Sequence, residues 1–472
     1  MLDAALRDRP DAEAVLSRSG SLTYAQLDAQ ADRAAAGLWS LGVRPGDRVA
    51  ASLPNDQDVV VAFHGAMRIG AIWVGIGEAL APPERAHLLD DSKPAVYLTA
   101  EDNPLLDAMA DAPEAPAVEI DVHAPAGIAY TSGTTGVPKG IVHSQHNLLL
   151  PGEVLVASRG WGPDLRKGDC LPLTILNLMV LTTLLTAQAQ GCCVVMDRRD
   201  ADGIAEWIER GRVTVWNGVP AQLHDLVTTK RVDPARLRSL REVWSGGGDC
   251  PESLRTAFED CYGLSIRTTY GLTEAPTVVS IDPVGTERRE GASGQVLPHL
   301  EVSTGDGEGE ITVSARADGD WAGRWRPYLG TWDGHGVAPN RDAVLATGDV
   351  GTVESGWLSV RDRLKLLIVR GGANVYPAEV ERVLLGVDGI AGAAVFGVPD
   401  ARLGERVGAV VEPSGGVRVD VATLREACAT ALAAYKVPER FAIVDALPRN
   451  AMGKVVRTGL VDLLAASGGS DT

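Results

Sequence analysis

The stretch Tyr130–Gly140, with the sequence YTSGTTGVPKG, decides how the rest of this chain is interpreted. An apolar run ending in Tyr130 leads into it, and the apolar pair Ile141-Val142 follows it. Between the two lie hydroxyl and glycine residues, a proline and a lysine. The pattern predicts a strand, a loop of the size of a phosphate group, and a second strand.

The residue types of this loop suit a bound anion. Gly133 and Gly136 let the backbone turn its N–H groups toward a phosphate, and four neighbouring side chains add hydroxyl donors: Thr131, Ser132, Thr134 and Thr135. Lys139 supplies a full positive charge. The loop is not a Walker A motif, because it lacks the spacing G-x-x-x-x-G-K-[ST] and the helix that follows directly. On composition alone, a flexible solvated loop is the commoner interpretation.

Length, composition and charge limit the class of protein. A chain of 472 residues exceeds what one hydrophobic core usually organises, so two or three domains are expected. A hydrophobic content of 45% and a charged content of 22% are typical of a globular protein rather than a disordered one. The formal charge of −18 disfavours a nucleic acid or an anionic membrane as partner, because both require a basic face.

Cysteine usage and the N-terminal residues predict a cytoplasmic location. The six cysteines show no C-x-x-C spacing and are interpreted as reduced thiols that pack in the core. The first residues lack the basic start and the apolar block of a signal peptide, and no apolar run is long enough to span a bilayer.

Helical and strand patterns alternate along the chain, which predicts mainly parallel sheets covered by helices. In the first third, the pattern favours helices over 22–42 and 56–70, strands over 49–53 and 96–98, and a surface connector over 105–125. A core strand over 170–177 and an apolar helix over 178–185 are expected next. The last hundred or so residues alternate strands with a helix over 421–434, which suits a compact α+β lid.

Three later stretches carry further candidate chemistry. In Thr269–Glu274, TYGLTE, Tyr270 can stack on adenine, Thr273 can reach a phosphate oxygen, and Glu274 can hold Mg²⁺ through oxygen ligation. In Trp244–Asp249, WSGGGD, three glycines permit a flat ligand to lie against bare backbone or simply mark a tight turn. At the end of a β-segment, Asp349 can accept both hydroxyls of a ribose, although a turn aspartate fits the local sequence equally well.

These stretches, in this order, resemble the motifs of the adenylate-forming superfamily, which contains acyl-CoA and aryl-CoA synthetases, peptide-synthetase adenylation domains and luciferases. The stretch Pro448–Val455, PRNAMGKV, is similar to the last motif of that family. The resemblance implies an α/β fold with a large N-terminal domain over 1–361 and a small mobile α+β lid over 362–472. It further implies a hinge at Lys365.

The resemblance also implies the reaction and the cofactors, namely ATP, Mg²⁺ and coenzyme A. A carboxylate attacks the α-phosphate of MgATP, giving an acyl adenylate and pyrophosphate, and the lid then rotates so that the thiol of CoA can attack. Lys454, Glu274 and Thr273 are the implied catalytic residues, with Glu274 as the metal ligand. The implied ATP site comprises Thr131, Ser132, Gly133, Thr134, Thr135, Gly136, Lys139, Gly247, Gly248, Asp249, Tyr270, Gly271, Asp349 and Arg363.

The sequence specifies the acid substrate and the acyl acceptor less closely than the nucleotide site. Gly371 and Gly372 are implied to line the approach of the thiol, and the acyl pocket is implied to contain Leu176, Asn177, Val219 and Gly246. The family's amino-acid-activating members hold the ammonium group with an aspartate shortly after this region, and Leu178-Met179-Val180 contains no acid. A medium fatty, alicyclic or aromatic acid is therefore expected, with Asn177 bonding a polar substituent. Transfer to a carrier-protein phosphopantetheine or an amine stays open, as does a nucleotide-binding regulator; a P-loop kinase is disfavoured by the spacing.

Overall fold

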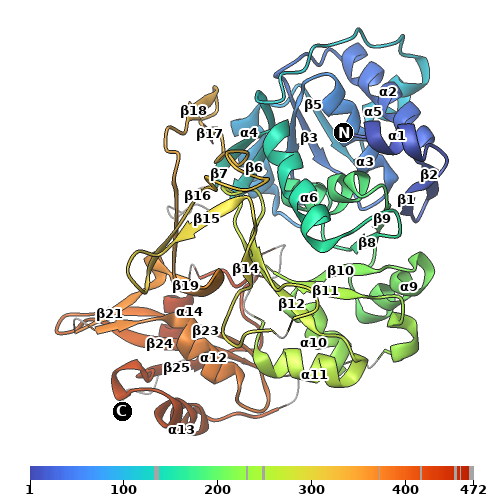
Figure 1. Cartoon of the computed structure of the whole chain (residues 1–472). Helices are drawn as coiled ribbons and strands as arrows, with labels where there is room; N and C mark the ends of the chain where they lie inside the picture. Colours follow the sequence, from blue (N-terminus) through green and yellow to red (C-terminus); the bar gives the residue numbers. More distant parts are fainter. Residues whose placement is uncertain are drawn as a thin grey trace.

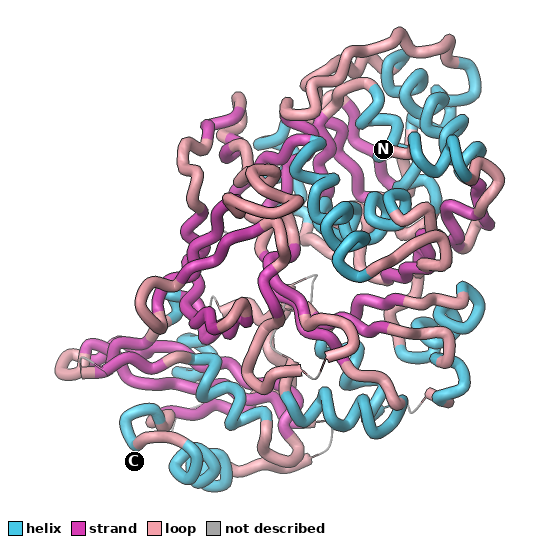
Figure 2. Tube along the Cα trace, viewed as in Figure 1, coloured by secondary structure: helices cyan, strands magenta, loops and turns pink. Residues whose placement is uncertain are grey.

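The computed structural model describes residues 1–131, 138–229, 232–246, 250–286, 288–371, 373–414, 417–450, 454–457 and 459–466. Figure 1 shows the N-terminal half in blue and green, and the C-terminal residues as a separate orange and red layer at the other end of the molecule. Figure 2 shows the same layers as strands flanked by helices. Within the described ranges, no helix is long and apolar enough to cross a membrane.

A seven-stranded sheet occupies the N-terminal region, in the order β18-β17-β7-β6-β4-β3-β5. Its central strands are parallel, whereas β6, β7 and β17 pair antiparallel. The strands are β3 (Arg48–Ser52), β4 (Ile72–Gly75), β5 (Val96–Thr99), β6 (Pro125–Thr131), β7 (Lys139–Ser144), β17 (Gly330–Trp332) and β18 (Val337–Pro339). Helices of this region are α1 (Asp3–Asp8), α2 (Tyr24–Ser40), α3 (Gln57–Arg68), α4 (Pro82–Ser92), α5 (Pro104–Asp111) and α6 (Gln145–Arg159).

A second path of thirteen strands runs β15-β16-β19-β20-β14-β13-β12-β11-β10-β8-β9-β1-β2. Its parallel part contains β8 (Arg166–Asp169), β9 (Cys192–Val195), β10 (Val215–Gly218), β11 (Glu242–Ser245) and β12 (Ile266–Gly271), with β1 (Glu13–Ser17) and β2 (Gly20–Thr23) at one edge. The antiparallel part contains β13 (Val278–Ile281), β14 (Gln295–Val296), β15 (Leu300–Ser303), β16 (Gly309–Ala315), β19 (Leu345–Glu354) and β20 (Trp357–Arg363). Its helices are α7 (Leu176–Leu178), the π-helix η1 (Met179–Leu184), α8 (Leu185–Gln188), α9 (Ala201–Gly211), α10 (Pro220–His224), η2 (Asp225–Thr229), η3 (Pro234–Leu237) and α11 (Glu252–Tyr262).

A third, five-stranded sheet forms the C-terminal layer and has its own core. The chain leaves β20, passes through the short helix η4 (Leu364–Leu366), and enters this sheet at β21 (Ile368–Arg370). The other strands are β22 (Ala373–Val375), β23 (Ile390–Asp400), β24 (Gly404–Pro413) and β25 (Arg440–Ile443), and the helices are α12 (Pro377–Leu385), α13 (Val421–Ala431), η5 (Ala434–Lys436) and α14 (Leu460–Ala466). The predicted small α+β unit is therefore present, and Asp362 links it to β20 by accepting the Ala378 N–H at 2.7 Å.

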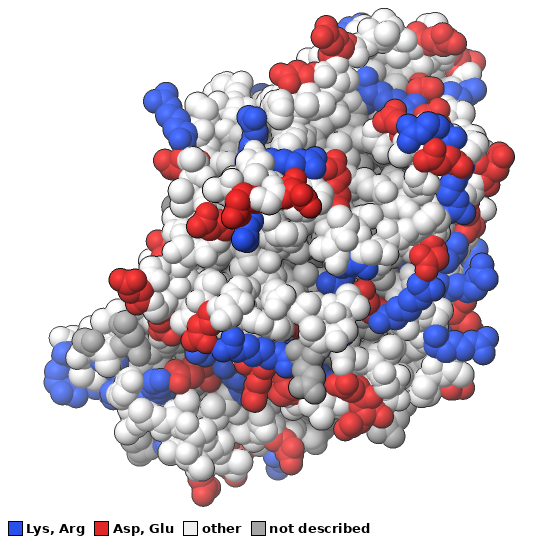
Figure 3. All heavy atoms as spheres, viewed as in Figure 1, with Lys and Arg blue, Asp and Glu red and all other residues white. Residues whose placement is uncertain are grey.

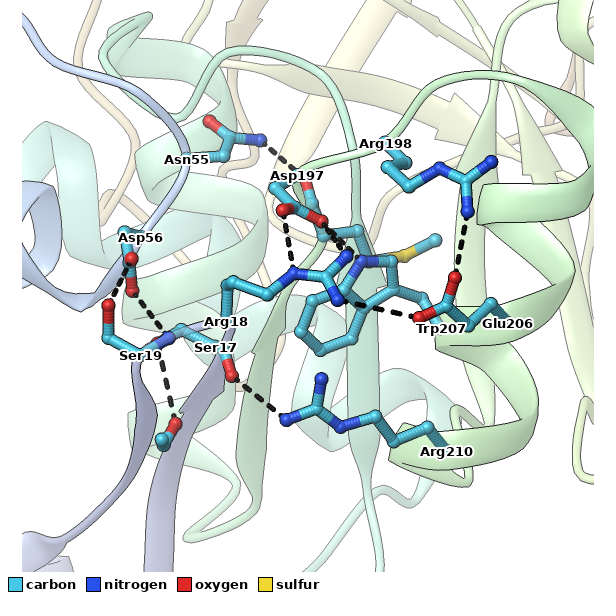
Figure 4. A network of polar contacts seen from close by, with 12 residues as sticks. Ser17, Arg18, Ser19, Asn55, Asp56, Asp197, Arg198, Glu206, Trp207 and Arg210 are labelled. Carbon is cyan, nitrogen blue, oxygen red and sulfur yellow. Dashed lines mark hydrogen bonds and ion pairs between the residues drawn. The ribbon is translucent and has the colours of Figure 1, made fainter.

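The N-terminal hairpin β1–β2 is an edge of the second path rather than of the first. Figure 4 shows how polar contacts hold this edge against α9: Arg18 pairs with Asp197 at 2.9 and 3.0 Å, and Trp207 donates to the same carboxylate at 2.7 Å. Ser19 of the hairpin turn donates to Asp56, the residue before α3, at 2.5 Å. These partly exposed pairs fix geometry more than they stabilise the fold.

Two local predictions are wrong. The stretch 105–125 is not a connector throughout, because helix α5 covers its start: Pro104 suits the first helical turn, and Leu105 is buried against Gly37 of α2. The expected strand over 170–177 ends instead at Asp169. The chain after it is a loop that Asn55 holds, accepting from the Leu173 N–H at 2.9 Å and donating to the Leu171 carbonyl at 2.8 Å. The helix expected over 178–185 is formed by η1 and the start of α8.

Gly75, at the end of β4, permits this loop to approach the first sheet. A Cβ added to Gly75 lies only 1.8 Å from the Thr174 carbonyl oxygen, which also accepts from the Trp73 indole at 3.1 Å. We expect Gly75→Ala to lower the free energy of unfolding by about 1–3 kcal/mol, because the backbone has to move apart. Urea denaturation measures this, with Gly162→Ala as the control, since its added Cβ has no neighbour within 4 Å. Equal midpoints for the two variants would contradict the prediction.

Candidate active site

The strands β6 and β7 hold the two ends of the predicted phosphate loop. Thr131 and Lys139 are directly opposite each other in the antiparallel register, and Lys139 is exposed. The loop between them, Ser132–Val137, lies outside the described residues, as do Gly247, Gly248 and Asp249 of the glycine-rich loop after β11. The two described ends of the loop thus leave the sheet side by side, with a lysine at one of them.

The turn after β12 is fixed to the same strand by a histidine that the sequence interpretation missed. His143 on β7 is fully buried, and its Nε2 lies 2.8 Å from the Thr273 carbonyl oxygen. Burial lowers the pKa of His143 to about 4, so the neutral ring donates its Nε2–H to that carbonyl. The Thr273-Glu274 turn is thereby held beside the strand that begins with Lys139. The signal available in the sequence was one polar residue, His143, directly after the apolar pair Ile141-Val142.

Asp349 is the centre of a second cluster. Its side chain is buried, accepts a hydrogen bond from the Tyr270 hydroxyl at 2.6 Å, and pairs with the Arg363 guanidinium at 3.1 Å. Burial and this carboxylate raise the pKa of Tyr270, so the phenol stays protonated as the donor. Asp349 is not at the end of a β-segment, as the sequence suggested, but inside β19 and directly opposite Arg363 of β20. The two strands of this hairpin thus bring the predicted ribose and nucleotide residues together.

Two lysines from the C-terminal part of the chain complete this cluster. Partial burial and the like charge of Arg363 lower the pKa of Lys365, whereas Asp349 and Glu274 act against the shift. Burial among protein atoms and the charge of Arg363 lower the pKa of Lys454, and the charge of Asp349 again acts against this shift. Both residues are exposed to solvent, and the charges of Arg363 and Asp349 act on each of them. Lys454, far away in the sequence, is thus within electrostatic reach of Asp349 and Arg363.

Three basic side chains share this region with the carboxylates of Asp349 and Glu274, although the protein as a whole is acidic. Arg363, Lys365 and Lys454 share this region, while the chain carries a formal charge of −18. On the face shown in Figure 3, basic and acidic side chains are interspersed. A local cluster of cations is what a site for a polyphosphate requires.

Glu274 suits a divalent cation. It is half-buried, and within the described part of the chain its carboxylate has no hydrogen-bond or ion-pair partner. Carboxylate oxygens are the ligands that Mg²⁺ prefers, and a magnesium ion bound here would still need several oxygens from water and phosphate. The predicted metal ligand thus fits the chemistry of the ion.

The predicted acyl-pocket residues divide into two groups. Asn177 is half-buried with its amide nitrogen 3.5 Å from the Thr273 hydroxyl, and Val219 is half-buried at the start of α10. Gly246 is half-buried too, and a Cβ added there lies 2.3 Å from the Thr269 hydroxyl. Leu176, in contrast, is in the core, where it covers the backbone of Gly127 on β6. It therefore belongs to the hydrophobic core next to β6.

The predicted thiol-approach glycines are at the turn between β21 and β22. Gly371 is exposed, has a φ of +60°, and donates its N–H to the Leu403 carbonyl at 2.7 Å. A positive φ favours glycine at this turn. Gly372 and residues 451–453, which precede Lys454, lie outside the described residues. Gly271, which was predicted as part of the ATP site and not of the thiol approach, is exposed at the end of β12, where a Cβ would lie 1.8 Å from the Thr277 carbonyl oxygen.

Comparison with known proteins agrees with this arrangement. The family model described as AMP-binding enzyme matches residues 2–320, and that of the AMP-binding enzyme C-terminal domain matches residues 379–454. The chain belongs to the AMP-binding enzyme family. This AMP-binding enzyme is 34% identical to feruloyl-CoA synthase of Amycolatopsis sp., with 96% of each chain covered. It is 32% identical to the long-chain-fatty-acid–CoA ligase FadD13 of Mycobacterium tuberculosis, with 94% of each covered.

A solved structure of the same architecture is o-succinylbenzoate CoA synthetase (MenE) from Bacillus subtilis in complex with an acyl-adenylate intermediate. The AMP-binding enzyme superposes on it with a TM-score of 0.86 at 27% identity, covering 97% of each chain. The predicted superfamily, the α/β fold with a small C-terminal domain, and the enzyme class of an AMP-forming acyl-CoA synthetase that uses ATP and CoA are thus confirmed. The roles of individual residues remain predictions.

Proposed function

We propose that this enzyme activates a carboxylic acid as an acyl adenylate at the cluster around Asp349, and then transfers the acyl group to CoA. Support for the assignment of residues comes from Asp349, which pairs with Arg363 at 3.1 Å and whose charge acts on Lys454 of the C-terminal part of the chain. Residues of both folded units therefore act in the first half-reaction. We propose the unit boundary after Arg361, near the end of β20, and the hinge at Lys365, which belongs to η4 between β20 and β21.

In the first half-reaction two anions have to meet, so the protein neutralises charge and aligns the reactants. Lys454 offsets the charge on the attacking carboxylate and the α-phosphate, and Lys139 with the adjoining loop binds the β- and γ-phosphates. Tyr270 supports the adenine, and Asp349 accepts the ribose hydroxyls. When Mg²⁺ is bound by Glu274, it supplies charge neutralisation at the phosphates.

In the second half-reaction the acyl carbon has to become accessible to a thiol. Rotation about Lys365 removes Lys454 and brings Gly371 and Gly372 toward the adenylate. The thiolate then forms the thioester bond, and AMP leaves with the electron pair of the broken C–O bond. The exposure of Lys365 fits a hinge residue whose surroundings change between two orientations.

The acid is proposed to be a medium fatty, alicyclic or aromatic one. Val219 and Asn177, two residues of the predicted pocket, are half-buried, and no acidic side chain stands in Leu178–Val180 to hold an ammonium group. The use of ATP and CoA, together with buried thiols such as Cys170 and Cys193, favours a cytoplasmic location.

The test is the release of pyrophosphate from ATP across a panel of carboxylic acids, each with and without CoA, and with Mg²⁺ or EDTA. We expect acid-dependent release, AMP as the nucleotide product, a CoA thioester, and loss of activity in EDTA. If the rate of pyrophosphate release does not depend on CoA and no thioester forms, the acceptor of the acyl group would instead be a carrier protein or an amine. No release with any acid would instead favour a nucleotide-binding regulator, and ADP as the product would indicate a kinase or ATPase.

A further inference from the structure

The turn between β15 and β16 contacts the C-terminal unit. Glu308 is the last residue of this turn, and its Oε1 accepts a hydrogen bond from the Tyr376 hydroxyl at 3.0 Å. Its Oε2 lies 3.5 Å from the Nε of Arg361 on β20. Burial and the Glu308 carboxylate raise the pKa of Tyr376, so the phenol stays protonated as the donor. The pairing with Arg361 thus orients Glu308 toward a residue of the other unit, and neither Glu308 nor Tyr376 is a predicted site residue.

The start of helix α12 is held by a second acceptor. Tyr376 is the N-cap residue of α12, and its side chain makes no hydrogen bond to the first turn of the helix. Asp362, near the end of β20, accepts the Ala378 N–H at 2.7 Å instead. A carboxylate at a helix N-terminus is favourable because the unpaired N–H groups of the first turn point toward it. The start of α12 is therefore fixed at two places, by Asp362 beside the crossing between the units and by Glu308.

Helix α12 connects this contact with the segment that carries Lys454. Glu381, farther along α12, accepts hydrogen bonds from the Arg457 guanidinium and from the Val395 N–H, both at 2.7 Å. Arg457 also donates to the Val395 carbonyl. Because Arg457 follows Lys454 by three residues, the Lys454 segment is anchored on α12. A shift of α12 is therefore expected to move Lys454 relative to Asp349, whose charge acts on it.

We propose that Glu308 and Tyr376 form a latch that holds the C-terminal unit in the orientation of the first half-reaction. The inference rests on the proposed function and adds two positioning residues to it, since both act on Lys454 through α12. The side chains of Glu308 and Arg361 are 41% and 47% exposed, and contacts between exposed charges are weak. Such a contact can break in every catalytic cycle, when the C-terminal unit rotates for the second half-reaction.

The experiment measures the two half-reactions of Tyr376→Phe separately. This variant keeps the ring and loses one hydrogen bond, so kcat for acid-dependent pyrophosphate release should fall by about three- to tenfold, while the KM for ATP stays near the parent value. Thioester formation from a supplied acyl adenylate and CoA should be at least as fast as in the parent, because this step requires the latch to be open. Tyr435→Phe, the same change at an exposed tyrosine of the same unit, should leave both rates unchanged.

A double-mutant cycle shows whether the latch acts through Lys454. If it does, adding Tyr376→Phe to Lys454→Ala should cause no further loss of pyrophosphate release, whereas two independent effects would multiply. Glu308→Ala removes the acceptor of the same hydrogen bond and should reproduce the loss measured for Tyr376→Phe. Glu301→Ala, at an exposed residue of the same hairpin, is the matched control and should keep the parent rate.

The possible results separate the latch from the proposed function. Parent rates of pyrophosphate release in both Tyr376→Phe and Glu308→Ala overturn the latch alone, as does a multiplied loss in the double variant. Equal losses in the two half-reactions show that these residues stabilise the fold, and they overturn the latch as well. A parent enzyme that releases no pyrophosphate with any acid overturns the proposed function, and the latch with it.

Discussion

Replacing Lys454 with alanine is expected to lower kcat for acid-dependent pyrophosphate release by about 10²–10³-fold, the loss usual when one charge-stabilising group is removed from a transition state. Two anions meet in this step, and Lys454, on which the charges of Asp349 and Arg363 act, is proposed as the cation that the C-terminal unit supplies. Since Arg363 is already paired with Asp349 at 3.1 Å, it cannot replace Lys454 fully. The KM for ATP should change little, because the other nucleotide contacts remain. Steady-state kinetics of pyrophosphate release measures both constants.

The same variant carries its own control. Supplied with a preformed acyl adenylate and CoA, Lys454→Ala should form the thioester within about threefold of the parent rate, since Lys454 is proposed to have left the site in that step. Lys454→Arg keeps the charge but changes its position, and should recover part of the first step. Equal loss in both half-reactions would indicate a structural role for Lys454, and full activity in the first would remove it from the mechanism.

Local chemistry made much of the fold predictable from the sequence. The strand–loop–strand pattern around Tyr130–Gly140 appears as β6 and β7, because glycine and hydroxyl residues interrupt two apolar runs. The helix predicted over 22–42 is α2, for which Thr23 and Gln26 form a capping box. Such signals are contained within a few neighbouring residues, so no tertiary information was needed to find them.

Other features depend on contacts between distant segments and were missed for that reason. His143 resembles any polar residue in a strand until Thr273 is placed against it. Lys167 and Glu242 are each ordinary surface residues by type, and only the sheet brings them together inside the core. Asp349 was expected at the end of a β-segment, but it lies inside β19, directly after Gly348, whose φ is +70°. Whether a side chain is buried depends on the whole fold, whereas a helix cap depends on a few neighbouring residues.

Replacing Asp349 with alanine is expected to raise the KM for ATP and lower kcat/KM by about 10²–10⁴-fold, because two hydrogen bonds to a charged acceptor are lost at about 1.5–3 kcal/mol each. The buried carboxylate already accepts the Tyr270 hydroxyl at 2.6 Å and pairs with Arg363. It is therefore held rigidly where the ribose is proposed to bind. The measurement is the ATP dependence of pyrophosphate release, together with AMP binding by calorimetry.

Tyr270→Phe is the matched comparison, since it removes one hydrogen bond to the same carboxylate and leaves its charge and its pairing with Arg363. The loss of kcat/KM for ATP in Tyr270→Phe should stay near tenfold, which corresponds to about 1.4 kcal/mol for one neutral hydrogen-bond donor. Because the buried carboxylate loses one donor and keeps only Arg363, the free energy of unfolding of this variant should fall by about 1–3 kcal/mol, so the folded fraction is measured before nucleotide affinities are compared. If a folded Asp349→Ala variant bound AMP as tightly as Tyr270→Phe, the ribose would have to be held elsewhere, and the hairpin β19–β20 would serve only to orient Arg363.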